Sequence, residues 1–511
     1  MTEPHFPGDG SRRFAGLSTG SRDFVARHAV WNDQQRAAAE DLERRLGELD
    51  LVRVVFGDPH GLARSKTLTV SAFRSVLRNG MDYSPGPFIF DTGHNVAVDF
   101  FAAGGGLGIP ELTGAGDFIV VPDPSTFRVL PHTAGARVGW VIGDEYLRSG
   151  QPHPLSGRAV LREVCARLAH RDLDGVVGLE VEWYLTKVLP GDVAAQVGGF
   201  GVQGEAPAVA PVNGGYQFNL DAFTHALGPI LEPLAAALTT LGLPLRTMEH
   251  ESGPGQLEFT FDPLEALAAA DAMLLFRTVT KQITAQHGYH ASFMALPGLR
   301  NFDPSGWHLH QSLAYRSSGR NAFAAEGRLL SELGEHYLAG LLSHAAETAM
   351  LAVPTVNGFR RLSDEFSLSP DRVVWTVENR GSLLRVLGGD GDAGTHVENR
   401  IGEPCANPYL YIASQISAGL AGIDAATPLD AAATDPHSAD APALPTTLGD
   451  ALELFRKSEL LRGVLGDALT ECLHQLKTSE WQRFRAWQDA VGADSTHTVS
   501  DWEQREYFAI Y

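Results

Sequence analysis

Acidic and imidazole side chains gather in three short motifs that lie far apart along the chain, with one further glutamate downstream. The candidate ligands are Glu180, Glu182, Glu251, Glu258, His308 and Glu398. Five carboxylates and one imidazole suit two hard divalent cations such as Mg²⁺ or Mn²⁺. Two such cations with no thiolate among their ligands indicate phosphoryl transfer. The sequence therefore predicts a two-metal site that acts on a phosphoryl group.

Each motif alternates polar and apolar residues, as a β-strand does when its polar side chains share one face. Glu180 and Glu182 flank Val181, and His308 and His310 are also two residues apart. An isolated pair of this kind is more often an ordinary solvated strand face. Like charges that are brought together cost free energy unless a cation compensates them. The joint pattern therefore favours three strands that aim their ligands into one space.

Arginines form a second group, which follows the acidic motifs in the chain. They are Arg360, Arg361, Arg380, Arg385 and Arg400. A guanidinium group binds carboxylate and phosphate through paired hydrogen bonds. A single arginine is more often an ordinary surface charge. Arg385 and Arg400, however, lie in strand-like segments beside Glu398, and this position favours a role in the site.

Composition and charge limit the classes of protein that this chain can represent. A length of 511 residues predicts more than one domain, and 44% hydrophobic residues allow a sizeable core. A net charge of −21 argues against nucleic acid or an anionic membrane as the main partner. Three widely spaced cysteines fit neither a zinc pattern nor a disulfide framework. With no signal-like or membrane-spanning apolar run, these features predict a cytoplasmic enzyme.

The expected elements divide the chain into a tail and two domains. Residues 1–22 are polar and glycine-rich, which predicts a flexible tail. Strands over 51–56 and 117–122 predict a small β-rich domain at 23–140. Strands alternate with helices over 141–511, so the fold class is expected to be α+β. The longer helices are expected over 158–169, 220–241 and 263–287.

A series of motifs from about residue 50 to the C-terminus resembles the glutamine synthetase family in order and spacing. They are Gly57–Gly61, Asp117–Asp123, Glu180–Glu182, Asn213–Tyr216, His250–Glu258, Ser305–Ser312, Asn357–Leu362, Asn379–Arg385, Glu398–Arg400 and Asn407–Leu410. The resemblance implies a small β-grasp domain ahead of a catalytic domain of antiparallel strands with helices. It also implies a homo-oligomer, a hexameric ring or a dodecamer, with active sites between neighbouring subunits.

The same resemblance implies ATP, L-glutamate and a small amine as the substrates. ATP would first convert the γ-carboxylate of glutamate to γ-glutamyl phosphate, and the amine nitrogen would then displace phosphate. One metal would lie near the γ-carboxylate and the second on the ATP phosphates. The ligands would be Glu182, Glu251 and Glu258 for the first metal, and Glu180, His308 and Glu398 for the second.

The resemblance also implies roles for residues that contact ATP and the transferred phosphoryl group. His310 and Ser312 would touch ATP, and Arg385 would bind its phosphates. Arg380 and Arg400 would offset charge on the phosphoryl group during transfer. These positions match the family motifs one by one. One position departs from the motifs: His396 stands where the family usually has an arginine near ATP.

Further roles concern glutamate and the amine. Arg361 would hold the α-carboxylate of glutamate, and Gly306 lies in the segment next to the glutamate site. Tyr216 is expected near the acceptor pocket. Asp58, from the adjacent subunit, would help to deprotonate the incoming amine.

The main departure from the family pattern concerns the acceptor. Ammonia-using members have a glutamate soon after the segment that matches Arg361, and counting from Arg361 places Ser367 at that position. That glutamate helps to bind ammonium and to accept its proton. Its loss leaves space and removes one negative charge, which favours a larger, less charged amine. Asp364 or Glu365 would replace it only after a loop shift.

The rim of the substrate entrance points to the same class of acceptor. Tyr83, Pro85, Pro87 and Phe88 make this rim bulkier and more apolar than the usual family sequence. We therefore predict a γ-glutamylamide ligase that uses an alkylamine, an arylamine or a polyamine. An apolar and aromatic rim favours a monoamine with an apolar body over a polycation.

Two other functions stay open at this level. The chain fits a true glutamine synthetase that uses ammonia, and it fits an inactive scaffold or regulatory homologue. The complete set of metal-binding side chains argues against the inactive alternative. The choice between ammonia and an organic amine depends on the position of Ser367.

Replacing Ser367 by glutamate should increase the use of ammonia, because it restores a carboxylate that can bind ammonium and take its proton. The measurement is ADP release with glutamate and either ammonium or an organic amine at equal free-base concentration. An unchanged ammonia rate in Ser367→Glu would contradict the role assigned to this position.

Overall fold

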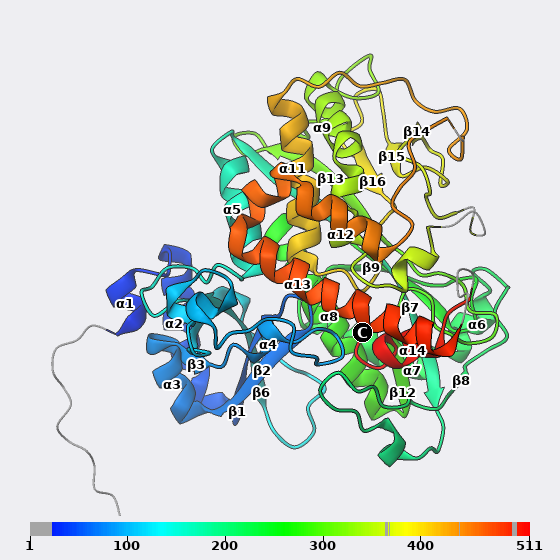
Figure 1. The fold of residues 1–511 in the computed structure, drawn as a ribbon. Helices are drawn as coiled ribbons and strands as arrows, with labels where there is room; N and C mark the ends of the chain where they lie inside the picture. The colour runs from blue at the N-terminus through cyan, green and yellow to red at the C-terminus, as the bar shows by residue number, and fades with distance from the viewer. Residues whose placement is uncertain (1–22, 363–365, 367, 439, 493–497) are drawn as a thin grey trace, which may run out of the picture.

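Two β-sheets organise the computed structural model, which describes residues 23–362, 366, 368–438, 440–492 and 498–511. A smaller sheet is formed by the N-terminal part, blue and cyan in Figure 1, and a larger sheet by the rest of the chain. The tail predicted over 1–22 lies outside the described residues. No helix among those described is long and apolar enough to cross a membrane.

The smaller sheet has six strands in the order β2-β1-β6-β4-β3, with β5 paired to β6. The strands are β1 Leu51–Gly57, β2 Ala63–Thr69, β3 Met81–Tyr83, β4 Phe118–Pro122, β5 Arg128–Val129 and β6 Val138–Tyr146. The helices of this part are α1 Phe24–His28, α2 Asp33–Arg45, α3 Val70–Asn79 and α4 Gly86–Ile89. Because β6 runs to Tyr146, the sheet extends past residue 140, and the division of the chain at that residue stays a prediction.

The larger sheet has ten strands, with the main order β14-β15-β16-β13-β7-β10-β9 and with β8, β11 and β12 also paired to β7. Its long central strands are antiparallel to one another, whereas β14 runs parallel to β15. The strands are β7 Leu173–Val188, β8 Val209–Pro211, β9 Leu245–His250, β10 Gln256–Phe261, β11 Leu264–Glu265, β12 Tyr289–Ser292, β13 Trp307–Tyr315, β14 Trp375–Val377, β15 Leu384–Leu387 and β16 His396–Asn399.

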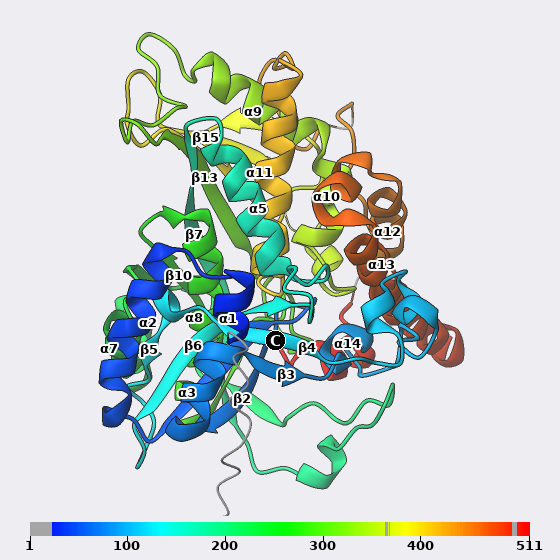
Figure 2. The ribbon, with the colours of Figure 1, turned by 90° about the vertical axis from the view of Figure 1, so that its left-hand side faces the viewer.

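Helices α5, α8 and α11 pack against one face of this sheet, as Figure 2 shows for α5 and α11 beside β13. Phe259 of β10 contacts Phe276 of α8, and Trp307 of β13 contacts Tyr411 of α11. This face is therefore apolar, which leaves the opposite face for polar side chains. The helices of this part are α5 Gly157–Ala169, α6 Asp221–Ala226, α7 Gly228–Thr240, α8 Ala266–Gln286, α9 Glu332–Ser343, α10 Ala345–Ala352, α11 Pro408–Asp424, α12 Leu448–Lys457, α13 Glu459–Val491 and α14 Asp501–Tyr507.

The expected strands and most expected helices are present, but the single helix predicted over 220–241 is wrong. The structure has two helices there, α6 and α7, which are separated at Leu227. Pro229 contributes to the break, because it lacks the N–H group that would donate to the carbonyl oxygen of His225 in a continuous helix. Proline is well tolerated in the first turn of a helix, and Pro229 occupies the first turn of α7.

Arg158 on α5 connects the two parts of the chain through buried ion pairs. Its guanidinium lies 3.0 Å from Asp123 and 2.6 Å from Asp144, which belong to the small-sheet part. It also lies 2.7 Å from Asp271 on α8. The Arg158 side chain is buried and pairs with all three carboxylates, whereas the half-buried Arg162 pairs with Asp144 at 2.9 Å and with Asp123 at 3.6 Å.

Replacing Arg158 by methionine should lower the free energy of unfolding by about 3–5 kcal/mol, because three carboxylates lose the buried cation that they share. Urea denaturation followed by tryptophan fluorescence measures the change. Arg44→Ala is the control, since Arg44 pairs with Asp41 on an exposed helix surface, where such pairs contribute at most about 1 kcal/mol. Equal effects of the two substitutions would contradict the structural role of Arg158.

Candidate active site

The register of the larger sheet brings the predicted metal ligands together on its polar face. Glu182 on β7 pairs with Glu258 on β10, and Glu258 pairs with Glu249 on β9. In the adjoining row, His308 on β13 pairs with Glu180 on β7. Directly opposite residues on neighbouring strands point to the same face. Two rows of acidic and imidazole side chains therefore lie side by side.

A third row continues the cluster toward the sheet edge. His310 on β13 pairs with Glu398 on β16, and Glu398 pairs with Arg385 on β15. His396 begins β16, and its Nε2 atom lies 3.0 Å from Nδ1 of His310. The alternation inferred from the sequence for His308 and His310 is thus present on a single strand, β13.

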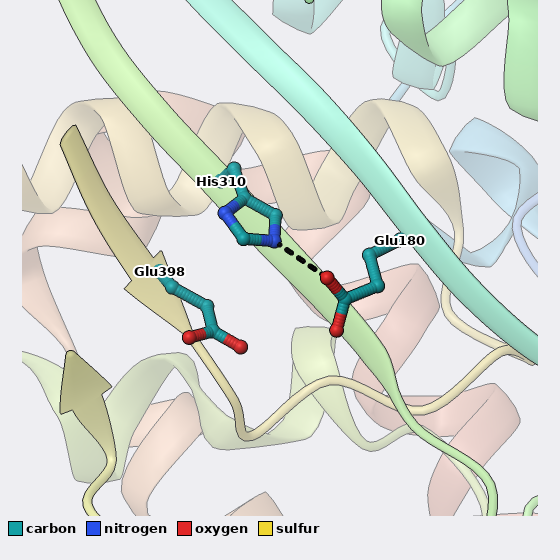
Figure 3. A group of neighbouring side chains, drawn as sticks. All are labelled: Glu180, His310 and Glu398. Carbon is teal, nitrogen blue, oxygen red and sulfur yellow. Dashed lines mark hydrogen bonds and ion pairs between the residues drawn. The ribbon is translucent and has the colours of Figure 1, made fainter. Parts of the chain in front are cut away.

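Glu180 lies at the centre of the cluster and contacts both histidines of β13. Its Oε1 atom lies 2.6 Å from Nδ1 of His308, and its Oε2 atom lies 3.0 Å from Nε2 of His310. Glu398 approaches His308 to 3.7 Å. Figure 3 shows Glu180, His310 and Glu398 converging from three different strands. Segments more than 200 residues apart, at Glu180 and Glu398, therefore meet at one point.

Three groups of these side chains place their ligand atoms within 4.8 Å of one another, close enough to share a cation. The groups are Glu180, His310 and Glu398; Glu180, Glu258 and His308; and Glu249, Glu251 and Glu258. Glu182 is beside them, and its Oε2 atom accepts hydrogen bonds from the Gly306 N–H at 2.8 Å and from Gln256 at 3.1 Å. Carboxylate oxygens with imidazole nitrogens are ligands that fit Mg²⁺ or Mn²⁺.

Three carboxyl groups on the β9–β10 side of the cluster resist ionisation. Burial raises the pKa of Glu182 to about 8, and the nearby Glu251 adds to the effect. Burial likewise raises the pKa of Glu251 to about 7. The pKa of Glu258 rises to about 10 through burial and the charges of Glu180 and Glu182. This half of the cluster therefore lacks the positive charge that its carboxylates need.

The other half of the cluster supplies its own compensation. Burial alone would raise the pKa of Glu180, but hydrogen bonds with His308 and His310 outweigh it and hold that pKa well below its usual value. Burial opposes ionisation of Glu398 too, but His308 and Arg400 lower its pKa. The two halves of the site thus differ in how much added positive charge they require.

Two of the predicted arginines flank Glu398. Arg385 donates to Glu398 at 3.1 Å and to Glu378 at 2.7 Å, and Arg400 donates to Glu398 at 2.5 Å. The Nε–H groups of Arg385 and Arg400 are buried and have no hydrogen-bond partner among the described residues. Arg380 is exposed on the segment before β15. The cluster therefore has guanidinium donors available beside its best compensated carboxylates.

Arg361 and Gly306 lie together beside Glu182. Arg361 is buried and donates to the carbonyl oxygen of Ile401 at 3.0 Å, while its Nε–H group has no described partner. A Cβ atom at Gly306 would lie 2.7 Å from Nε2 of His308 and 3.0 Å from Nη2 of Arg361. Only glycine allows this close approach, so the predicted substrate residue is also a steric requirement of the site.

Ser312 and Tyr216 occupy the two ends of the predicted site. Ser312 lies two residues after His310 on β13 and therefore shares its face. Tyr216 is half-exposed, has a φ of 56°, and donates from its hydroxyl to the Asn301 carbonyl at 3.0 Å. Burial raises the pKa of Tyr216, and the charge of Asp303 adds to the effect. The Tyr216 ring therefore lies near the loop before β13. Their roles toward substrates stay predictions.

Asp58 lies in the turn between β1 and β2 and Tyr83 ends β3, and no described hydrogen bond or ion pair joins them to the acidic cluster. The Asp58 carboxylate is buried and accepts from the N–H groups of His60 and Leu62, both at 2.9 Å. It also accepts from Nε of Arg64 at 2.6 Å. Burial raises the pKa of Tyr83, with Arg64 and Asp58 close enough to influence it. The two predicted acceptor-side residues of this domain are therefore neighbours.

The sequence predictions also omitted residues that the structure adds to the site. Glu249 joins Glu251 and Glu258, and the spacing Glu249-His250-Glu251 repeats that of Glu180 and Glu182. This repeated spacing is the sequence feature that could have identified Glu249 as a candidate ligand. Arg64 was not predicted, since no local pattern links it to Asp58. Ser367, on which the choice of acceptor depends, lies outside the described residues.

Comparison with known proteins identifies the family. The family model for the glutamine synthetase catalytic domain matches residues 154–507. The chain belongs to the glutamine synthetase family. A γ-glutamylanilide synthase from Acinetobacter sp. is 40% identical to it, over 96% of this chain and 99% of the relative. A glutamine synthetase from Thermococcus kodakarensis is 32% identical, over 79% of this chain and 88% of the relative.

A solved structure supports the fold independently of close sequence similarity. The GmaS–ADP complex matches with a TM-score of 0.72 at 24% identity, over 89% of this chain and 98% of that chain. The predicted family and the α+β fold class are confirmed. The predicted enzyme class, an ATP-dependent ligase that forms an amide from glutamate and an amine, is confirmed with the family.

Binding of Mn²⁺ should release protons near pH 7, because Glu182, Glu251 and Glu258 hold raised pKa values and must lose protons to bind a cation. Calorimetric titration in two buffers of different ionisation enthalpy measures the number released. Glu258→Gln should release fewer protons than the parent enzyme. Binding without proton release would contradict the protonation of these groups.

The same groups predict the pH dependence of the metal-free protein. Their pKa values are higher in the folded than in the unfolded chain, so folding takes up protons. The free energy of unfolding should therefore fall as pH rises through about 7 and about 8, where Glu251 and Glu182 ionise.

Proposed function

We propose that this enzyme joins the γ-carboxylate of L-glutamate to an aromatic monoamine and forms a γ-glutamylamide, ADP and phosphate. The observation that carries the proposal is the 40% identity to γ-glutamylanilide synthase over 96% of this chain. The apolar rim near Tyr83, predicted from the sequence, supports an acceptor with an aromatic body. The complete acidic and imidazole cluster supports an active enzyme over an inactive homologue.

Two divalent cations, Mg²⁺ or Mn²⁺, are proposed to bind on the polar face of the larger sheet. The proposed ligands are Glu180, His308 and Glu398 for one cation, and Glu182, Glu251 and Glu258 for the other. The unusually high pKa values of the second set fit a cation site, since added positive charge would let these groups ionise. When bound, the cations would supply charge stabilisation for phosphoryl transfer.

The residues on the β13–β16 side are proposed to bind ATP. His310 and Ser312 share one face of β13, and Arg385 lies across β16 from them. The unpartnered Nε–H groups of Arg385 and Arg400 are donors that fit phosphate oxygens. Arg400, with the exposed Arg380, would offset the charge that develops on the phosphoryl group.

Glutamate is proposed to bind between Arg361 and the Glu182 side of the cluster. The unpartnered Nε–H of the buried Arg361 fits a carboxylate, which supports its assignment to the α-carboxylate. The absence of a side chain at Gly306 leaves room between His308 and Arg361. The γ-carboxylate oxygen would attack the terminal phosphorus of ATP, with ADP as the leaving group.

The amine is proposed to enter between two subunits of a ring, either a hexamer or a dodecamer. Its nitrogen would attack the acyl carbon, phosphate would leave, and a base would take the amine proton. Asp58 of a neighbouring subunit is the proposed base, and Tyr83, Tyr216 and Ser367 are the proposed neighbours of the acceptor. The Asp58 carboxylate accepts two hydrogen bonds on Oδ1 and one on Oδ2. A carboxylate has about four acceptor sites, so Oδ2 keeps one for the proton of the amine. A cytoplasmic location stays a prediction.

Ammonia is the second candidate acceptor. The 32% identity to a glutamine synthetase over 79% of this chain favours it. The higher identity and coverage of the anilide synthase, together with serine at position 367, favour the aromatic amine instead.

An amine panel should separate the candidates. ADP release with glutamate and aniline should exceed that with ammonium in kcat/KM by at least about tenfold, the scale set by apolar pocket contacts, at equal free-base concentration. Ethylamine and a diamine complete the panel. Glu258→Ala should abolish turnover with every amine. Ammonium outperforming all organic amines would overturn the proposed acceptor.

A further inference from the structure

The turn between β1 and β2 is held by a side chain from the catalytic part of the chain. Asn407 donates from its Nδ2 atom to the carbonyl oxygen of Asp58 at 3.0 Å and to that of Pro59 at 3.2 Å. Asn407 is buried, as are Asp58 and Pro59. A buried amide that bonds two successive carbonyl groups fixes both the position and the orientation of the backbone.

Two more buried side chains bind the next carbonyl groups of the same turn. Tyr511 donates from its hydroxyl to the His60 carbonyl at 3.5 Å, and Arg277 donates from Nη2 to the Gly61 carbonyl at 2.7 Å. Four consecutive carbonyl groups, from Asp58 to Gly61, therefore accept hydrogen bonds from side chains outside the turn. We call Asn407, Tyr511 and Arg277 the carbonyl clamp.

The carbonyl clamp joins the turn to the segment that follows Glu398. The Oδ1 atom of Asn407 caps α11 by accepting from the N–H groups of Tyr409 and Leu410. Arg277 donates from Nη1 to the carbonyl oxygens of Pro404 and Ala406 at 2.9 and 3.1 Å. The same side chains thus bind the turn of one domain and the start of a helix in the other.

The backbone of the turn leaves little freedom of its own. Gly61 has a φ of 75°, and a Cβ atom there would lie 2.7 Å from Cα of Asn407. Inside the turn, the Asp58 carboxylate bonds the N–H groups of His60 and Leu62 and pairs with Arg64. The turn therefore orients the Asp58 carboxylate and the Arg64 side chain that pairs with it. The carbonyl clamp in turn fixes the backbone of the turn.

We propose that Asn407 is a positioning residue for the amine step: it holds the Asp58–Arg64 turn in the place from which Asp58 acts on the acceptor. This inference rests on the proposed role of Asp58. Phosphoryl transfer uses side chains of the larger sheet, and the described side-chain hydrogen bonds of Asn407 go to the turn and to the start of α11 instead. Loss of the Asn407 amide should therefore slow amine transfer without slowing formation of γ-glutamyl phosphate.

Asn407→Ser tests this separation, because serine retains a cap for α11 but lacks the amide N–H groups that reach the turn. The kcat for amine-dependent product formation should fall by about tenfold or more, as expected when a catalytic group is misplaced. KM for ATP and glutamate should stay within about twofold, the range expected when their direct contacts are kept. Positional isotope exchange in ¹⁸O-labelled ATP, with glutamate and no amine, should match that of the parent enzyme.

Two further variants protect the test against a general folding defect. Asn407→Thr keeps a neutral side-chain oxygen for the helix cap but lacks the amide N–H groups, and it should reproduce the loss in amine transfer. Asn79→Ser is the matched control, since its amide donates to a single carbonyl on α3, away from the turn. It should retain full activity.

A double-mutant cycle decides whether Asn407 acts through Asp58. In an Asp58→Asn background, Asn407→Ser should cause no further loss of amine transfer. The inference would be overturned if the double variant lost activity by the product of the two single losses. It would also be overturned if isotope exchange fell as much as amine transfer, or if both Asn407 variants kept full activity. Wild-type rates in Asp58→Asn would overturn the role of Asp58 and this inference with it. Failure to use aniline would overturn only the proposed acceptor, because the cycle runs with any amine that the parent enzyme accepts.

Discussion

The pairing register of β7 with β10 and β13 is the constraint on which the site depends. It sets Glu182 opposite Glu258 and Glu180 opposite His308. Side chains alternate along a strand, so a slip of one residue would turn every ligand toward the helices. The apolar residues between the ligands prevent this slip. Val181 and Trp183 are fully buried, and each such side chain stabilises the register by about 1.5–3 kcal/mol through burial.

The same register concentrates negative charge in one place, and the protein compensates it unevenly. Histidines lower the pKa of Glu180, and His308 and Arg400 lower that of Glu398. The pKa values of Glu182, Glu251 and Glu258 are instead raised above those of ordinary glutamates. A sheet face that only served folding would gain nothing from three half-buried carboxyl groups placed close together. The uneven compensation fits a cation site on the β9–β10 side and a nucleotide site beside the arginines.

The sequence predicted which strands carry the ligands, but it could not predict which strands pair. Alternation is a local pattern, and it located Glu180, Glu182, His308 and His310 correctly on strands. The contact between Glu398 and His308 depends on tertiary packing across many intervening residues, which only the family resemblance suggested.

Three further features had different causes. Glu249 carried a local signal, its spacing from Glu251, whose meaning appeared only with the β9–β10 pairing. The break between α6 and α7 reflects the missing N–H group of Pro229, which the hydrophobic pattern does not show. Burial of the Asp58 carboxylate had no local signal, because Asn407 and Arg277 reach the turn from distant parts of the chain.

A crystal structure of the enzyme with Mn²⁺ and ADP, with anomalous data collected near the manganese absorption edge, tests the central claim most directly. We expect two anomalous peaks on the polar face of the larger sheet. One should be bound by Glu180, His308 and Glu398, and the other by Glu182, Glu251 and Glu258. Peaks elsewhere, or no peak within coordination distance of these side chains, would contradict the account.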